Sequence, residues 1–152
     1  MTDKTKEQTL SAQTAILLLI EQLVKLKNIA DGFAEYLEAK QFVEREYIPQ
    51  YVRDCYHESL LAYEKQVQRD ICRQAGICKA FYGPCMDLFQ FLNENLRYNI
   101  IAGRDTLNIY QDDFSLIKDE GWYQIVKFCK LQIKRLEFVQ NLIQSDMPEE
   151  ER

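Results

Sequence analysis

A long run of regularly spaced apolar residues, from Ile16 to Leu37, constrains the fold of this chain more than any other feature. Its members recur at alternating steps of three and four residues: Ile16, Leu19, Leu23, Leu26, Ala30, Phe33 and Leu37. This spacing places all of them on one side of an α-helix. Leu17, Ile20 and Val24 widen that side into a broad apolar face. Because such a face has to be covered by other helices, the stripe predicts an all-α bundle.

Composition agrees with one domain built from a few long helices. The chain has 152 residues, of which 47% are hydrophobic and 28% charged, as in ordinary globular domains. Five glycines and three prolines leave few turns, so the elements between them must be long. We expect a single helical domain over residues 8–144, with a frayed N-terminus at 1–7 and a disordered acidic tail at 145–152.

About four main helices are expected, and the first should be the longest. It is capped near residues 9–11 and runs to about Tyr47, because Pro49 lacks an amide donor and disfavours helical geometry just before it. The second helix is expected from about Pro49 to Gln74, with Gly76 as its C-terminal stop.

Glycine and proline also set the predicted limits of the later helices. A third helix restarts at 83–84 and ends at Gly103. Residues 104–118 are expected to form a loop with at most one helical turn. The last helix begins near 119–120, where acidic side chains suit a helix N-terminus, and runs to about Gln144.

Charge and cysteine content exclude several classes of protein. The net charge of −5 gives no general attraction to nucleic acid or to anionic membranes, and no apolar run is long enough to span a bilayer. The cysteines are odd in number and form no closely spaced pair, which favours reduced thiols in the cytoplasm over disulfides or a metal site. They are Cys55, Cys72, Cys78, Cys85 and Cys129.

No catalytic, metal-binding or nucleotide-binding motif is present, so we expect no cofactor. The single histidine, His57, lies near Arg53, Asp54 and Glu58. A histidine base needs a positioned partner, and a helical metal site of this kind needs a second histidine that the chain lacks. We therefore predict neither a catalytic nor a metal site. A small helical hydrolase or nuclease using His57 with Arg53 and nearby acids stays open as an alternative.

The last predicted helix carries apolar residues on two sides. Its main side comprises Trp122, Ile125, Val126, Cys129, Ile133, Leu136, Val139 and Ile143. A second seam lies beside it and comprises Phe128, Leu131, Arg135, Phe138 and Leu142. The main side accounts for burial within one bundle, so the seam exceeds the apolar surface that a monomer usually exposes. We predict that the seam is the partner-binding site.

A line of lysines on the same helix, Lys127, Lys130 and Lys134, has Tyr123 above it and could meet phosphate groups. Glu137 interrupts the line, and a nucleic-acid-associated protein is kept as the other alternative. The interpretation we favour is a non-enzymatic cytoplasmic helical protein-interaction module, such as an adaptor, regulator or chaperone-like protein. It would self-associate or bind a protein partner.

Overall fold

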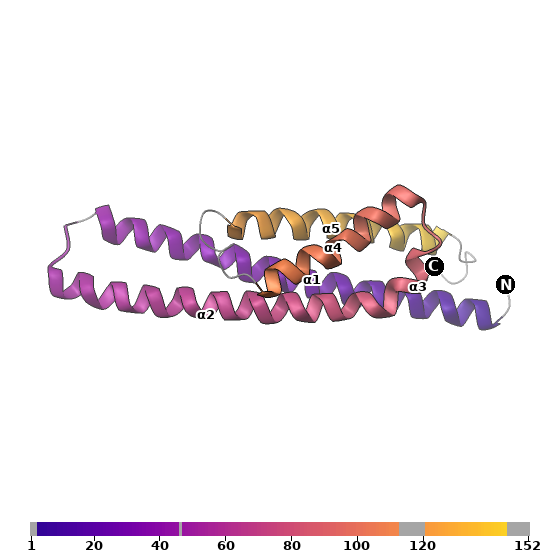
Figure 1. Ribbon diagram of the computed structural model, residues 1–152, viewed down its shortest axis with the longest axis horizontal. Helices are drawn as coiled ribbons and strands as arrows, with labels where there is room; N and C mark the ends of the chain where they lie inside the picture. Colours follow the sequence, from indigo (N-terminus) through magenta and orange to yellow (C-terminus); the bar gives the residue numbers. More distant parts are fainter. Residues whose placement is uncertain (1–2, 46, 113–120, 146–152) are drawn as a thin grey trace.

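The computed structural model is a bundle of helices (Figure 1). It describes residues 3–45, 47–112 and 121–145, with side chains from residue 11 onward. The predicted all-α class, with a long first helix and four main helices, is confirmed for these residues. The main helices are α1 (Asp3–Arg45), α2 (Gln50–Tyr82), α4 (Glu94–Asp112) and α5 (Gly121–Ser145). Between α2 and α4 lie a 3-10 turn, η1 (Gly83–Cys85), and a one-turn helix, α3 (Met86–Phe89).

Helix α1 is the element on which the bundle is assembled. Both α2 and α5 pack along it, whereas α4 packs mainly on α2. Figure 1 shows α4 and α5 over the same part of the hairpin that α1 and α2 form. The end of the hairpin where α1 passes into α2 extends beyond both of them. The molecule therefore has a body of several helices and a projecting two-helix end.

The predicted apolar stripe of α1 is the centre of the core. Its members from Ile16 to Phe33 are all buried, and Leu37 is half-buried against the same cluster. The cluster also takes in the inner faces of the other helices, which contribute Val67, Ile71, Ala75, Cys78, Tyr82, Ile100, Leu107, Ile125, Cys129, Leu136 and Val139. The removal of these apolar side chains from water is the main force that holds the helices together.

The projecting end of the hairpin has a much thinner core. α2 has no buried side chain over residues 50–66, and α1 contributes Tyr36 and Val43. The Tyr36 hydroxyl donates a 2.8 Å hydrogen bond to the Glu64 carboxylate, which ties the two helices together. We call residues 34–45 and 50–66 the arm.

Several helix limits differ from the predicted ones. α1 begins at Asp3, before the expected cap, and ends at Arg45. The predicted break at Pro49 is confirmed, and the Pro49 carbonyl accepts the amides of Val52 and Arg53 at 3.0 Å. α5 begins at Gly121, close to the predicted start. Residues 113–120 and 146–152, which hold part of the predicted loop and nearly all of the predicted tail, lie outside the described residues.

Two glycines predicted to end helices lie inside them instead. α2 continues through Gly76 to Tyr82, and α4 continues through Gly103 to Asp112. The prediction of a loop at 104–112 is therefore wrong. An interior glycine costs about 1 kcal/mol relative to alanine, which the burial of apolar side chains on both sides of each glycine outweighs.

The predicted third helix over residues 83–103 is also wrong, because the chain breaks between α3 and α4. Asn93 begins α4: its side-chain oxygen accepts the amide of Leu96 at 2.8 Å, and its carbonyl accepts the amide of Arg97 at 2.9 Å. Asparagine is a strong N-cap, and this bond satisfies one of the amides that a helix start leaves open.

A buried polar network joins α2, α4 and α5. Gln132 of α5 is fully buried, and its Nε2 donates to the Tyr82 hydroxyl at 2.7 Å and to the Ile100 carbonyl at 3.1 Å. A Cβ atom at Gly103 would lie 1.8 Å from that same Nε2 and 2.9 Å from the Tyr82 hydroxyl oxygen. Gly103 is therefore the residue that lets α4 approach this network.

Replacing Leu23 with alanine should lower the free energy of unfolding by about 2–5 kcal/mol, because the side chain is fully buried in the central stripe. Urea unfolding of the intact chain measures the change. Leu17→Ala is the matched control, since this leucine of the same helix is half-exposed and its loss should cost much less. A change at Leu23 below about 0.5 kcal/mol, as at a surface site, would contradict its place in the core.

Gly103→Ala should destabilise the protein by about 1–3 kcal/mol, because the new methyl group forces Gln132 out of its hydrogen bonds. The cost should be smaller in a Gln132→Ala background, where the obstructing amide is absent. Gly83→Ala is the control, since Gly83 has a helical φ of −51° and nothing lies within 4 Å of the added Cβ. Equal costs at Gly103 in both backgrounds would exclude the proposed contact.

Candidate functional site

The outer surface of α5 exposes three of the large apolar side chains in the predicted partner-binding seam. The exposed fractions are 49% for Leu131, 52% for Phe138 and 42% for Leu142. They recur at steps of seven and four residues, so they lie along one side of the helix. We call these three residues the apolar seam.

The other two members of the predicted site are engaged within the fold. Phe128 is half-buried and meets the Tyr110 ring of α4 edge to face, with centroids 5.5 Å apart. Arg135 is half-buried, and its Nη1 donates to Gln132 Oε1 at 2.9 Å. Arg135 thus has a hydrogen-bond partner within its own helix.

The lysine line lies next to the apolar seam on the same helix. Lys127, Lys130 and Lys134 are all exposed, and so is Tyr123 one turn before them. The Lys127 ammonium lies 4.7 Å from the centre of the Tyr123 ring, a cation–π contact. We call these four residues the lysine stripe.

A second charged row, which was not among the predicted candidates, lies on α1 and runs into the arm. Asp31, Glu35 and Glu38 are exposed, and Phe42 follows them with 59% of its surface exposed. Asp31 lies 3.8 Å from the Lys27 ammonium, an ordinary surface ion pair four residues apart. The spacing of four, three and four residues puts the row on one side of α1, a signal that the sequence alone contains. We call these four residues the acidic stripe.

His57, the basis of the enzyme alternative, is exposed on the arm. It borders an open groove of about 290 Å³ together with Lys40, Leu61 and Glu64. The Tyr36 hydroxyl in the same groove is a poor acid at neutral pH, because burial and the hydrogen bond to Glu64 raise its pKa to about 12. Among the described residues, no group of three or more potential metal ligands comes together.

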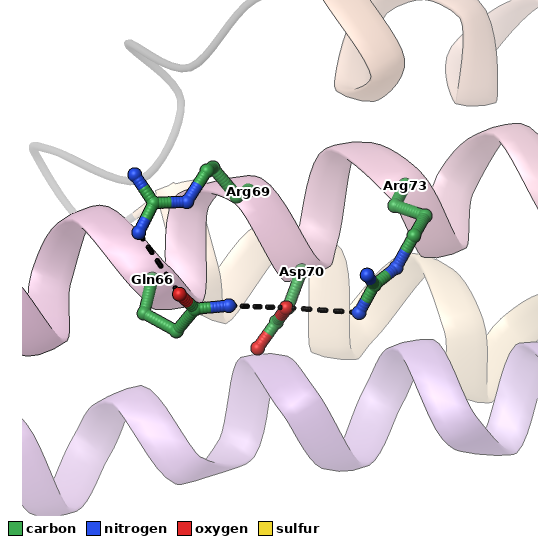
Figure 2. A network of polar contacts seen from close by, with 4 residues as sticks. All are labelled: Gln66, Arg69, Asp70 and Arg73. Atoms are coloured by element: carbon green, nitrogen blue, oxygen red, sulfur yellow. Dashed lines mark hydrogen bonds and ion pairs between the residues drawn. The ribbon is translucent and has the colours of Figure 1, made fainter.

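Other charges on α2 are satisfied along the helix itself (Figure 2). Gln66 accepts a 2.9 Å bond from Arg69 and donates a 2.9 Å bond to Asp70. Arg73 donates to the same Asp70 oxygen at 3.1 Å. Pairs three and four residues apart stabilise the helix on which they sit, so this row is structural.

The cysteines are free, and three of them are buried. Burial raises the pKa of the Cys85 thiol to about 11 and that of the Cys78 thiol to about 12. Burial likewise raises the pKa of Cys129 well above its ordinary value. These thiols stay protonated at neutral pH, which makes them weak nucleophiles. Of the remaining two cysteines, Cys72 is half-buried and Cys55 is exposed.

Comparison of the chain with protein-family models, curated proteins and solved structures gives no match. Within the described ranges, no helix is both long and apolar enough to cross a membrane. The residues themselves must therefore carry any inference about function.

Alkaline pH should destabilise the protein through the buried thiols. An unfolded thiol has a pKa of 9.0, and the folded values are raised. The stabilising effect is thus fully present below about pH 9 and is lost as the pH rises toward the folded values, by up to about 1.4 kcal/mol per pH unit and thiol. Urea unfolding at about pH 8 and about pH 10 should show this loss.

Cys78→Ala combined with Cys85→Ala should reduce the alkaline loss of stability, because two of the raised thiols are then absent. Cys55→Ser removes an exposed thiol and is the matched control, which should leave the loss unchanged. An alkaline loss that is the same in the double variant as in wild type would contradict the assignment to these thiols.

Proposed function

We propose that this protein is a non-enzymatic, cytoplasmic helical protein-interaction module, which self-associates or binds a protein partner through the outer surface of α5. The observation that carries the proposal is the apolar seam, Leu131, Phe138 and Leu142, three large side chains left 42–52% exposed along one side of one helix. Exposed apolar side chains that form one contiguous patch usually mark an interaction surface, whereas singly scattered ones are normal on any protein.

The surroundings of the seam support a protein as its partner. The seam lies beside the lysine stripe on a helix whose inner face is fully occupied by the core. An apolar centre with polar and charged neighbours is the usual composition of a protein–protein interface. The free thiols support a reducing compartment, as expected of a cytoplasmic protein.

The alternative of a hydrolase or nuclease has less support. His57 is exposed, and Asp54, the acid closest before it, accepts a 2.8 Å hydrogen bond from Gln50. A general base needs a partner held within hydrogen-bonding reach of the substrate. Among the described contacts of His57, none supplies such a partner.

Light scattering on wild type and on Leu131→Asp with Phe138→Asp tests the proposal. The double variant should remain folded, because both side chains are exposed in the single chain. It should lose the association of the wild type, because burying two carboxylates in the interface is strongly unfavourable. If wild type self-associates, the readout is its mass; if it captures a defined protein, the readout is the retention of that protein.

Ile109→Asp with Tyr98→Asp is the matched control, because both side chains are large, exposed and on the outer side of α4. This variant should behave as wild type. A wild type that is monomeric at high concentration and binds no protein would rule the proposal out. A Leu131/Phe138 variant that unfolds would also do so, because the seam would then belong to the core.

A further inference from the structure

The lysine stripe and the acidic stripe have the same residue spacing, and the aromatic residue stands at the N-terminal end of one row and at the C-terminal end of the other. The lysine stripe reads Tyr123, Lys127, Lys130 and Lys134, with steps of four, three and four residues. The acidic stripe, read backwards, is Phe42, Glu38, Glu35 and Asp31, again with steps of four, three and four. Each row covers one side of a helix over 11 intervals, or about 16 Å at 1.5 Å per residue.

Only an antiparallel pairing of the two rows satisfies all four positions. It sets each lysine opposite one carboxylate and the Tyr123 ring opposite the Phe42 ring. In the parallel pairing, Tyr123 would face Asp31 and Lys134 would face Phe42. The order of aromatic and charged residues thus specifies that the two helices run antiparallel, in addition to the attraction between their opposite charges.

The two rows cannot meet within one chain. α5 turns its buried face, which includes Ile125, toward the core that it shares with α1. At 100° per residue, Lys134 lies about 180° around the helix from Ile125. The lysine stripe therefore points away from the α1 of its own chain, and its side chains are exposed.

We propose that a second copy of this chain occupies this surface: the lysine stripe of each copy packs against the acidic stripe of the other. This inference rests on the proposed function and names its partner. Two-fold symmetry, the commonest arrangement of homodimers, makes the contact twice and closes the assembly.

The fold supplies an independent reason for such a contact. Among the helices that the structure describes, only α1 and α2 form the arm, and its α2 part has no buried side chain over residues 50–66. In the dimer, α5 of the partner lies along the arm, much as α5 of the same chain lies along the body. Exposed ion pairs are individually weak, so they set direction and register, while burial of Phe42, Tyr123 and the apolar seam supplies most of the attraction.

Charge reversal tests the inference, with molecular mass from light scattering or sedimentation as the readout. Lys127→Glu with Lys130→Glu sets acids against acids, and Glu35→Lys with Glu38→Lys sets bases against bases. Wild type should have twice the 18.1 kDa mass of one chain. Each double variant alone should have the mass of one chain.

An equimolar mixture of the two variants should recover the two-chain mass, because both contacts then join opposite charges. The chain that carries all four substitutions should dimerise for the same reason. Lys25→Glu with Arg104→Glu, at exposed positions outside the arm, the stripes and the apolar seam, is the control and should remain dimeric. Circular dichroism confirms that each variant is folded.

The inference is overturned if wild type is monomeric, if either variant alone stays dimeric, or if the mixture stays monomeric. A mass that grows past two chains with concentration also overturns it, because the contact then fails to close. Should Leu131→Asp with Phe138→Asp abolish association while the charge reversals do not, the proposed function survives and this pairing does not. If wild type is monomeric but binds a different protein, the proposed function likewise survives and the pairing of the two stripes does not.

Discussion

Burial of the apolar stripe of α1 is the interaction on which the rest of the structure depends. α2 and α5 each pack against α1, so both are positioned by the same row of buried side chains. α4 reaches the body mainly through α2. Because α5 covers only part of α1, the remaining length of the hairpin is left as an arm with a thin core. The elongated shape follows from the unequal lengths of the helices that share one stripe.

Within this apolar body, the position of α4 is fixed by polar contacts. Gln132 brings an amide into a fully buried place, where an unpaired polar group would be costly. Its bonds to the Tyr82 hydroxyl and the Ile100 carbonyl remove that cost. The bonds have fixed geometry, unlike apolar contacts, so they specify one placement of α4 against α2 and α5. Gly103 is then required because no side chain fits between α4 and the Gln132 amide.

The surface follows a different logic from the core. A chain with a net charge of −5 carries a basic row on one helix and an acidic row on another, and neither row faces its counterpart within the chain. A charge distribution of this kind does little for the stability of a monomer, because exposed pairs are weak and screened by salt. In the dimer that we propose, the basic row on the outer side of α5 in one copy faces the acidic row that runs into the arm of the other copy.

The sequence by itself determined the all-α class, the long first helix, the buried side of α1 and the limit at Pro49, because helical periodicity and proline geometry are local properties. It also placed the seam and the lysine line on one helix. Only the tertiary structure decided that Gly76 and Gly103 lie within helices, that Phe128 and Arg135 are engaged within the fold, and that Leu131, Phe138 and Leu142 remain exposed. The physical reason is the same in each case. Whether a glycine ends a helix or an apolar residue is covered depends on what approaches it from another helix, and Tyr82 and Gln132 approach Gly103 from positions far away in the sequence.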